Sequence, residues 1–300
     1  MAEADDAAVL ELDDRYCSSL LPRRDPSGHK FSFGRVVTVC GSLDYAGAAY
    51  LASLGAARAG AGLVAMAVPA SLRPTLAARL PEAILVPLGE FAEGEVRVDD
   101  AVAAITAREP SVLVIGPGLN ETDDYSALVF ALISQFEVPA VLDAGALNML
   151  SSTEEWWERT AGNLVLTPHP GEFARLTGEK VGDGDDERLE RAAQAAAKFG
   201  QVLVLKGART VIAAADGRAA VSPFANPVLA TAGSGDVLAG AIGALLAQGM
   251  EPFDAACLGV FLHGRAGERL SSRFGDAGVL ASEIANELPA ARHALTQGSA

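Results

Sequence analysis

The chain contains the stretch Leu229-Ala230-Thr231-Ala232-Gly233-Ser234-Gly235-Asp236-Val237-Leu238-Ala239-Gly240, in which a turn of small residues runs directly into an apolar helix expected over 237–248. Gly233 and Gly235 let the backbone take conformations that other residues resist, and they let a ligand approach closely. A helix start presents free N–H groups and a partial positive charge, both of which suit a phosphate group. The stretch therefore predicts an anion site at a helix start.

Asp236 is the unusual residue of this stretch, because a carboxylate beside an anion site repels phosphate. It needs a task of its own there, such as taking a proton from a hydroxyl that attacks a phosphoryl group. The alternative is that Asp236 only caps the helix, where an acid in the first turn is favourable. The stretch by itself leaves both interpretations open.

Short apolar runs alternate with helical patterns along most of the chain. Strands are expected over 35–40, 63–68, 83–86, 111–115, 139–143, 164–167 and 201–205. Further helices are expected over 7–20, 45–58, 71–79, 99–108, 125–136, 146–150, 189–199 and 253–270. This alternation indicates βαβ units around a mostly parallel sheet that is covered on both faces. The runs 211–214 and 219–221 flank Asp216-Gly217 and predict a hairpin at an edge of that sheet.

The composition indicates one domain behind an acidic lead. The chain has 300 residues, of which 50% are hydrophobic, and this is enough for a substantial core. We expect a partly ordered acidic lead over 1–26 and a single domain over 27–300, since no linker or charge block divides the chain after residue 30. The net charge of −15 argues against a general affinity for nucleic acid or for anionic membranes.

The sequence also indicates where the protein is found. Its 3 cysteines, Cys17, Cys40 and Cys257, lie far apart and form no CxxC, as in a reduced cytosolic chain. The first residues lack the basic start and apolar run of a signal peptide, and no run is long enough to span a membrane. We therefore expect a cytoplasmic protein.

Glycines and polar residues follow one expected strand after another. They are Gly41-Ser42, Gly116-Pro117-Gly118, Asp143, His169 with Glu172, and Lys206-Gly207-Ala208-Arg209-Thr210. Ligands of open parallel sheets bind beyond the carboxyl ends of the strands, so these residues predict a site at one rim. Lys206 ends a run of Val and Leu, and its ammonium group must emerge at that rim, where phosphate is a natural partner.

Each of these residues also has a plainer explanation. Gly-Pro-Gly after a strand is commonly just a turn, and Asp143 is a candidate cap for the following helix. His169 stands in a stiff loop between two prolines, and His263-Gly264 fits helix packing. Common nucleotide and hydrolase motifs are missing: there is no GxxxxGK[ST], no complete GxGxxG, no zinc spacing and no GxSxG.

Gly233-Ser234-Gly235-Asp236 resembles the phosphoryl-transfer motif of the ribokinase-like superfamily. The other blocks occur in the order of one family within it: His29-Lys30, Gly34-Arg35-Val36, Gly41-Ser42, 45–49, 58–64, 116–119, Asp143-Ala144, Thr167-Pro168-His169-Pro170-Gly171-Glu172-Phe173, 206–210 and His263-Gly264. On these residues the chain resembles the ADP- or ATP-dependent NAD(P)H-hydrate dehydratases from about His29 to Leu288. The resemblance implies a ribokinase-like three-layer α/β/α sandwich.

The resemblance also implies a reaction. NADH and NADPH that are hydrated at the nicotinamide ring no longer donate hydride. The family phosphorylates the added hydroxyl of the S-epimer with a nucleotide and eliminates phosphate, which restores the dihydronicotinamide. ADP is the donor expected here over ATP, Mg²⁺ would neutralise phosphate charge, and a separate NAD(P)H-hydrate epimerase would supply the reactive epimer.

Residue roles follow from the same resemblance. Asp236 would be the catalytic base, and the N–H groups of Gly233, Ser234 and Gly235 would form the anion hole for the transferred phosphoryl group. The nucleotide would be bound by Lys206, Gly207, Ala208, Arg209, Thr210 and Gly235. The hydrated dinucleotide would contact Ala48, Gly118, His169 and Asp236. Asn226 and Glu172 are second-rank candidates near the metal or the substrate.

Three positions depart from the family pattern: Ala232 and Phe31 each replace a glycine, and Asn120 replaces a common glycine after Leu119. None of them removes a proposed catalytic group. Two other functions stay open, a superfamily kinase acting on a hydroxymethylpyrimidine, a thiazole or a sugar alcohol, and a nucleotide-binding sensor without turnover. The TPHPGE block argues against the kinase, and the intact Lys206 and Asp236 argue against the sensor. A homotetramer is expected from the family.

Overall fold

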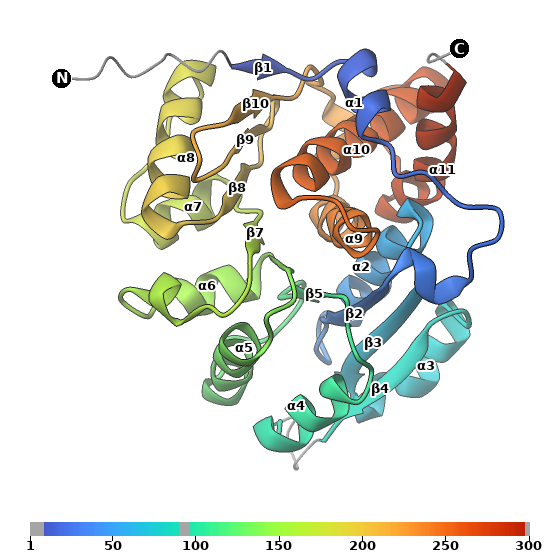
Figure 1. The fold of residues 1–300 in the computed structure, drawn as a ribbon, viewed down its shortest axis with the longest axis vertical. Coiled ribbons are helices and arrows are strands. Elements are labelled where there is room, and N and C mark those ends of the chain that lie inside the picture. Colours follow the sequence, from blue (N-terminus) through green and yellow to red (C-terminus); the bar gives the residue numbers. More distant parts are fainter. Residues whose placement is uncertain (1–8, 90–95, 298–300) are drawn as a thin grey trace.

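A computed structural model describes residues 9–89 and 96–297 of the chain. In this part of the chain, ten strands form one sheet in the order β1-β10-β9-β8-β7-β6-β5-β2-β3-β4 (Figure 1). Their bounds are β1 Leu10–Glu11, β2 Arg35–Val39, β3 Leu63–Pro69, β4 Ile84–Leu88, β5 Val112–Ile115, β6 Ala140–Leu142, β7 Leu164–Leu166, β8 Val202–Leu205, β9 Val211–Ala213 and β10 Ala219–Val221. All neighbouring strands are parallel except β9, which is antiparallel to both β8 and β10. The expected mostly parallel sheet is confirmed.

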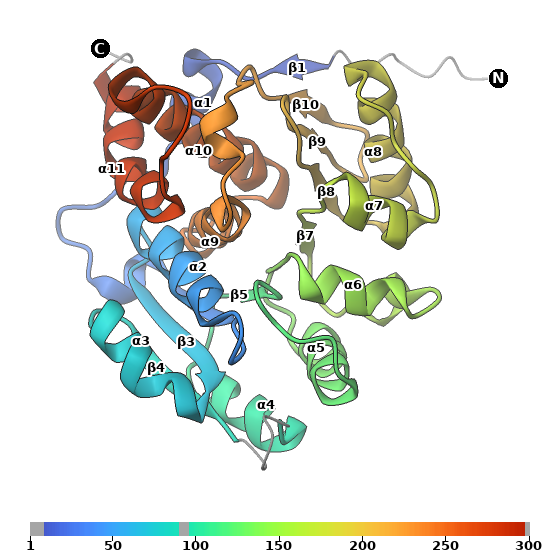
Figure 2. The same ribbon diagram turned by 180° about the vertical axis from the view of Figure 1, so that it is seen from behind.

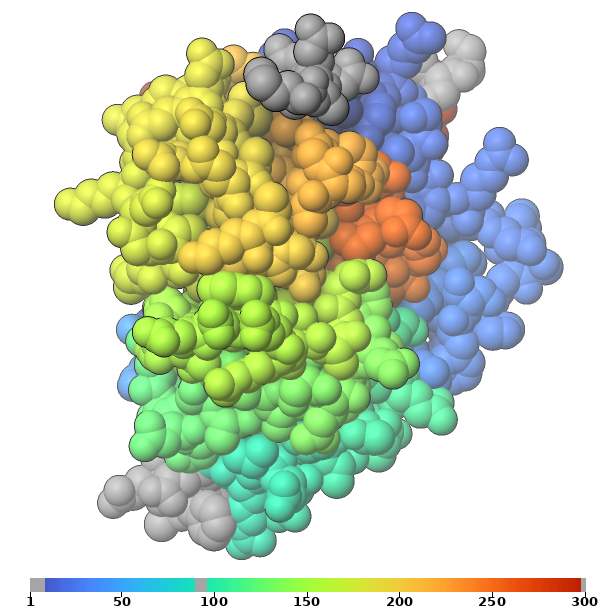
Figure 3. Space-filling model, turned by 60° about the vertical axis from the view of Figure 1, so that its left-hand side comes forward, coloured from blue at the N-terminus to red at the C-terminus, as the bar shows by residue number. Residues whose placement is uncertain are grey.

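Helices cover both faces of this sheet, as Figures 1 and 2 show from opposite sides. One face carries α2 Ala46–Ala59, α3 Arg73–Arg79, α9 Ser234–Ala247, α10 Pro252–Phe274 and α11 Ala281–Gln297. The other face carries α4 Val98–Thr106, α5 Asp123–Gln135, α6 Gly145–Ser151, α7 Pro170–Thr177 and α8 Asp185–Phe199. In Figure 3 the side chains of the green-to-yellow helices cover this second face. Short 3₁₀ helices are η1 Lys30–Phe33, η2 Ala70–Leu72, η3 Trp156–Arg159 and η4 Pro227–Leu229. The three-layer α/β/α sandwich is therefore confirmed.

The strands divide their side chains between two cores. In β5, Val112 and Val114 enter the core under α2 and α9, whereas Leu113 and Ile115 enter the core under α4 to α8. Successive side chains of a strand point to opposite faces, so a sheet that is buried twice needs an unbroken apolar run. This is why the strands appeared in the sequence as short continuous apolar stretches.

Glycines bring α2 and α9 into backbone contact. A Cβ atom at Gly240 would lie 1.9 Å from the carbonyl oxygen of Ala52, and one at Gly55 would lie 2.4 Å from that of Val237. A Cβ atom at Gly233, at the start of α9, would lie 2.3 Å from Leu51, and Gln248, at the other end of α9, donates to the Ala59 carbonyl at 3.3 Å, so the two helices run in the same direction. Their first turns therefore open at the same edge of the sheet, the edge at which the parallel strands end.

The N-terminal segment differs from the expectation. The helix expected over 7–20 is α1, Asp14–Leu20, and it begins later because Asp13 caps it by accepting from the Tyr16 N–H at 2.7 Å. Residues before it form β1, which pairs in parallel with β10. The predicted hairpin is present as β9 and β10, but β1 lies outside it, so the hairpin is not the outermost pair. Residues 1–8 and 298–300 lie outside the described residues, and the boundary between residues 26 and 27 stays a prediction.

Two helices were not expected from the sequence. The prolines around His169 suggested a stiff loop, yet Pro170 occupies the first turn of α7, where the missing N–H costs nothing. The second helix, α11, contains Pro289 inside it. A proline in this chain can therefore mark the start of a helix, as at Pro170, or lie inside one, as at Pro289. Among the described residues, no helix has the length and hydropathy needed to cross a membrane.

Candidate active site

The rim predicted from the sequence is present along five neighbouring strands. Cys40, Gly116, Asp143, Thr167 and Lys206 are the first residues beyond β2, β5, β6, β7 and β8, which lie close together in the sheet. Because these strands are parallel, their carboxyl ends meet at one edge. The first turn of α9, which follows the hairpin, opens at the same edge and places Asp236 there.

Lys206 lies at the centre of this edge and is held by carboxylates. Its Nζ donates to Asp143 Oδ1 at 2.6 Å and lies 3.8 Å from Glu172 Oε2. Burial alone would lower the pKa of Lys206, but the negative charges of Asp143 and Glu172 outweigh this and raise it. Lys206 is therefore an ammonium ion that reaches the rim as expected, already paired with Asp143.

Asp143 does not cap the helix that follows it. Ala144 is the N-cap residue of α6, where no side chain caps the backbone, and it has a φ of +50°. A positive φ is strained for an alanine, which shows that the chain turns sharply here to direct Asp143 toward Lys206. Asp143 is 1% exposed, so its carboxylate is a buried partner of the ammonium group.

Asp236 completes the cluster and has an unusual proton affinity. Burial, then the nearby Asp143 and Glu172 carboxylates, raise the pKa of Asp236 from 3.8 to about 7, against the opposing effect of Lys206. A carboxylate with such a pKa is suited to accept a proton near neutral pH. Helix capping alone would not require this arrangement of one ammonium and three carboxyl groups.

His169 and Glu172 form a capping box at the start of α7. His169 Nδ1 accepts from the Gly171 N–H at 3.0 Å, while Glu172 Oε2 accepts from the His169 N–H at 2.8 Å. The other imidazole nitrogen, Nε2, lies 3.3 Å from Glu172 Oε1, and half of the His169 side chain is exposed. His169 is thus the last residue of the short link between β7 and α7, where it caps the helix that the sequence did not predict.

The glycine turn before α9 has the predicted backbone. Gly233 has a φ of +85° and caps α9, a conformation that favours glycine. The Ser234 N–H donates to the Thr231 carbonyl at 3.2 Å, so in this arrangement it is used inside the turn. The Ser234 hydroxyl lies 3.0 Å from His263 Nε2 of α10. The Ser234 N–H is therefore already paired within the turn, and the anion-hole roles of Gly233, Ser234 and Gly235 stay a prediction.

His263 was interpreted from the sequence as a packing residue within one of the family blocks. Burial lowers the pKa of its imidazole to about 4, so it is neutral near pH 7. Its Nε2 also lies 3.0 Å from the Ser234 carbonyl oxygen. His263 therefore fixes the first residue of α9, and no local sequence signal could have indicated this, because the pair is separated by 29 residues.

A cavity of about 600 Å³ opens beside Lys206 and brings several predicted residues together. The predicted ones among its lining residues are His169, Lys206, Gly207, Ala208, Thr210, Ser234, Gly235 and Asn226. Its other wall is apolar and was not predicted; it includes Phe224, Leu229, Leu238 and Val260. The cavity thus has a polar end at the cluster and an apolar end between the hairpin and α10.

Small residues of α10 make room for this apolar wall. A Cβ atom at Gly264 would lie 2.1 Å from the Phe224 ring, and one at Gly267 would lie 2.6 Å from Leu229. Glycine at these two positions lets both side chains seat against the helix. Gly264, which the sequence left as a packing residue, therefore shapes the cavity.

Six of the predicted residues lie outside the lining of this cavity: Ala48, Gly118, Glu172, Arg209, Gly233 and Asp236. Ala48 and Gly118 pack together instead, since a Cβ atom at Gly118 would lie 2.7 Å from Ala48 Cβ. Leu51, one turn after Ala48 in α2, lies against Gly233 and connects this pair to the start of α9. The role of Ala48 and Gly118 in binding stays a prediction.

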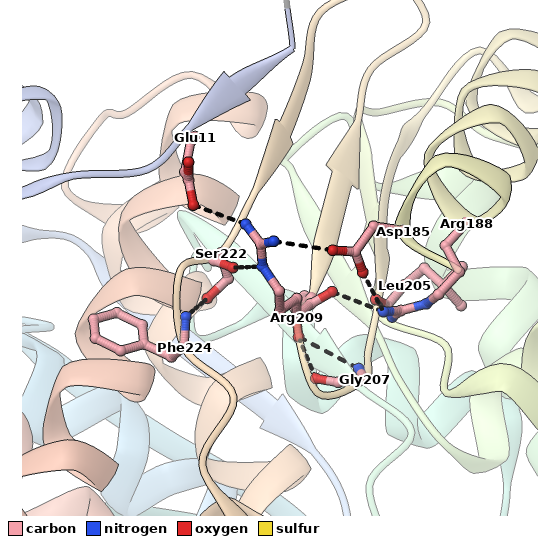
Figure 4. Close-up of polar contacts among 9 residues, drawn as sticks. Glu11, Asp185, Arg188, Leu205, Gly207, Arg209, Ser222 and Phe224 are labelled. Atoms are coloured by element: carbon pink, nitrogen blue, oxygen red, sulfur yellow. Dashed lines mark hydrogen bonds and ion pairs between the residues drawn. The ribbon is translucent and has the colours of Figure 1, made fainter. Parts of the chain in front are cut away.

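Arg209 is another of these residues, and Figure 4 shows its guanidinium group directed toward Glu11, Asp185 and Ser222. The guanidinium group donates to Asp185 Oδ2 at 3.1 Å, to Glu11 Oε1 at 2.7 Å and to the Ser222 carbonyl at 3.3 Å. Only the backbone of Arg209 belongs to the loop that borders the cavity.

The carboxylates at the rim do not form a ready Mg²⁺ site. Asp143 and Glu172 are tied to Lys206 and to the His169 N–H, and residues 9–89 and 96–297 contain no group of three His, Cys, Asp or Glu side chains placed to hold a metal. Magnesium would therefore have to be held chiefly by the phosphate groups of a nucleotide.

Comparison with known proteins identifies the family. A family model described as NAD(P)H-hydrate dehydratase matches residues 36–290 of the chain. The chain belongs to the NAD(P)H-hydrate dehydratase family. The resemblance seen in the sequence motifs is therefore confirmed, and the family match includes all residues of the cluster around Lys206.

Relatives of this dehydratase family match most of the chain. The chain is 45% identical over 276 residues to the bifunctional NAD(P)H-hydrate repair enzyme of Moorella thermoacetica, and the match covers 91% of this chain and 52% of that protein. It is 39% identical over 282 residues to the ADP-dependent (S)-NAD(P)H-hydrate dehydratase of Xanthomonas campestris, covering 92% and 94%. The chain thus spans about half of the length of the first relative and nearly all of the second.

A solved structure of the dehydratase family has the same fold. It is the ADP/ATP-dependent NAD(P)H-hydrate dehydratase from Bacillus subtilis, co-crystallised with ATP and Mg²⁺, with a TM-score of 0.81 and 33% identity. The match covers 96% of this chain and 99% of that one. The ribokinase-like fold expected from the sequence is confirmed.

Proposed function

We propose that this chain repairs hydrated NADH and NADPH by ADP-dependent dehydration of the S-epimer. The observation that carries the proposal is the cluster at the rim, in which Asp236 stands beside Lys206 at a glycine-lined helix start. That geometry suits transfer of a phosphoryl group to a hydroxyl, and membership of the dehydratase family gives the hydroxyl its identity.

The first chemical step is attack of the ring hydroxyl on the terminal phosphorus of the donor. The new O–P bond forms as the bridging O–P bond of ADP breaks, so AMP leaves with the electron pair. The hydroxyl proton goes to Asp236, whose pKa of about 7 lets it accept a proton near neutral pH. The helix start and Lys206 stabilise the charge on the transferred group.

The second step is elimination. The C–O bond to the phosphorylated oxygen breaks, phosphate departs with the electron pair, and loss of a proton from the ring restores the dihydronicotinamide. Phosphorylation makes this step easier because phosphate is a much better leaving group than hydroxide. No additional oxidant or reductant is needed, and the products are NADH or NADPH, AMP and phosphate.

The cavity suits the nucleotide. Its apolar wall of Phe224, Leu229 and Val260 would take the adenine base, and the loop 206–210 would take the phosphates. Lys206 would exchange part of its contact with Asp143 for a phosphate oxygen. Mg²⁺, when bound with the nucleotide, supplies charge neutralisation; the chain's own residues supply positioning and the base.

The direct test is recovery of reduced nicotinamide. Hydrated NADH is incubated with the protein, Mg²⁺ and either ADP or ATP, and the absorbance of the reduced ring is followed. Recovery with ADP supports the proposal. Comparing ADP with ATP gives the preferred phosphoryl donor, and comparing hydrated NADH with hydrated NADPH gives the preferred substrate. No recovery with either nucleotide rejects it, and a stable phosphorylated product would indicate a superfamily kinase. Nucleotide binding with no turnover would indicate a sensor.

Further parts of the proposal concern assembly and location. We propose a cytoplasmic homotetramer that works with a separate NAD(P)H-hydrate epimerase. Light scattering of the purified protein tests the tetramer. Faster recovery from a mixture of both epimers when an epimerase is added would support the partnership.

A further inference from the structure

Arg188 is a buried charge that the proposed reaction does not use directly. It lies in the first turn of α8 and is only 5% exposed. Burial lowers the pKa of its guanidinium group, and the start of a helix is an unfavourable place for a positive charge. Burial and the helix start both destabilise the positive charge of Arg188, so this charge requires strong hydrogen-bond partners nearby.

Those partners are carbonyl groups at the two ends of the nucleotide loop. Arg188 Nη2 donates to the Leu205 carbonyl at 3.0 Å, and Nη1 donates to the Arg209 carbonyl at 2.8 Å. One rigid guanidinium group therefore spans the loop 206–210 from behind, as the close-up in Figure 4 shows. In a planar trans peptide the N–H points opposite to the C=O, so the Thr210 N–H points away from Arg188.

The absence of a side chain at Gly207 leaves the space that the Arg188 guanidinium group occupies. A Cβ atom at Gly207 would lie 2.2 Å from Arg188 Nη2 and 2.7 Å from its Cζ, so any larger residue would displace the guanidinium group. Gly207 lines the cavity on its other side. The loop is therefore one backbone layer thick between the buried guanidinium group and the cavity.

Two further side chains hold Arg188 in place. Asp185, one turn earlier in α8, lies 3.9 Å from Arg188 and also accepts from Arg209 at 3.1 Å. Arg209 in turn reaches Glu11 of β1 at 2.7 Å. The loop is thus connected from behind to α8 and to the N-terminal strand.

We propose that Arg188 is a positioning residue for the nucleotide. By binding the carbonyl groups of Leu205 and Arg209, it fixes the loop 206–210 so that its Thr210 N–H and its Lys206 side chain face the phosphates. Its charge, lying just behind Gly207, adds to the attraction for them. This inference rests on the proposed function only in identifying the loop as the nucleotide loop.

The test is direct titration with ADP and Mg²⁺ by calorimetry, which needs no turnover. Arg188→Lys keeps the charge but reaches one carbonyl at most, and we expect ADP binding about tenfold weaker. The KM for ADP should rise in parallel, while the KM for hydrated NADH stays within twofold and kcat within threefold. A general loss of structure would instead change all of these values together and lower the melting temperature.

Gly207→Ala gives a second route to the same question. In the natural background it should weaken ADP binding at least tenfold, because the new methyl group displaces the guanidinium group. In an Arg188→Ala background the space beside Gly207 is free, so Gly207→Ala should weaken ADP binding by less than a further twofold. Fully additive losses would contradict the inference.

Arg191→Ala is the matched control. Arg191 lies one turn later on α8, is partly exposed, and pairs with Glu179 at 2.6 Å instead of with the loop carbonyl groups. Arg191→Ala should keep the dissociation constant for ADP within twofold of the wild-type value. Wild-type ADP affinity in folded Arg188→Lys and Arg188→Ala would overturn the inference, as would absence of ADP binding to the wild type.

The outcomes for the two proposals are separable. If ADP binding depends on Arg188 but hydrated NADH is not restored, the loop inference stands and the proposed dehydration fails. If hydrated NADH is restored and both Arg188 variants bind ADP normally, the dehydration stands and the inference fails.

Discussion

Asp236 is a carboxylic acid whose surroundings hold its proton unusually tightly. Burial and the neighbouring Asp143 and Glu172 raise its pKa to about 7. A base with this pKa loses its function when it is protonated. We therefore expect kcat/KM to rise with pH up to about 7 and then to level off on the alkaline side.

Replacing this base tests its role. Asp236→Asn keeps the shape of the side chain but cannot accept the hydroxyl proton, so the rate should fall by about 10²-fold or more. ADP binding, measured by titration, should stay within threefold of the wild type. A variant that keeps most of its rate would show that Asp236 is only a helix-start residue.

The same substitution has an effect on stability with a definite sign. The folded-state pKa of Asp236, about 7, is above its unfolded value of 3.8, so its contribution to stability is present below pH 3.8 and is lost as pH rises through 7. The neutral amide avoids that loss. Asp236→Asn should therefore gain stability over the wild type between pH 4 and pH 8, on the order of 1–3 kcal/mol. Thermal unfolding of the wild type and the variant at pH 4 and at pH 8 measures this gain. An equal difference in stability between the two proteins at both pH values would contradict the raised pKa of Asp236.

Asp143 offers a separate test of the same electrostatics. Its carboxylate is the largest charge effect raising the pKa of Asp236, so Asp143→Asn should move the acid limb of the pH–rate profile below pH 7. It should also loosen Lys206 and change the KM for ADP. An acid limb that stays in place while activity is retained would show that the limb belongs to another group.

Among the secondary-structure elements, the contact between α2 and α9 determines where α9 begins relative to the rim. Gly240 and Gly55 place backbone against backbone, and this brings the start of α9 to the rim. In Gly240→Ala, the new methyl group would overlap the Ala52 carbonyl, so we expect a loss of about 2 kcal/mol or more and a misplaced Asp236.

Gly47 on α2 is the matched control for that prediction, because a Cβ atom there would meet nothing within 4 Å. Gly47→Ala should stabilise the protein by about 0.5–1 kcal/mol, the usual gain from replacing glycine in a helix. Denaturant unfolding of both variants gives the comparison. Equal effects of the two substitutions would mean that the packing of α2 on α9 does not control stability.

For the whole molecule, the N-terminal strand β1 is attached beside the nucleotide loop through Arg209. Its ion pairs with Glu11 and Asp185 are partly exposed, so they contribute little to stability. Arg209→Met should cost no more than about 1 kcal/mol and leave the ADP dissociation constant within threefold. A large loss of affinity at unchanged stability would show that the Arg209 side chain itself contacts the nucleotide.

Much of the architecture could be predicted from local patterns. The central strands are short apolar runs because both of their faces are buried, and glycines or polar residues follow the carboxyl ends of several parallel strands. The mostly parallel sheet, the hairpin and the rim residues Lys206 and Asp236 followed from this. Helices α7 and α11 and the two-residue strand β1 were not predicted. Pro170 in the first turn of α7 and Pro289 inside α11 obscure the two helices, and a strand of two residues leaves no periodic signal.

The sequence by itself determined which chemical groups the rim contains and that the chain is built from βαβ units, since periodicity and turn residues are properties of neighbours in the chain. Only the tertiary structure decided their pairing. Lys206 lies against Asp143 because β8 and β6 both flank β7, and Arg188 lies behind Gly207 because α8 packs on β8 and β9. These contacts depend on strand order and helix packing across long separations, which residue patterns along the chain do not encode locally.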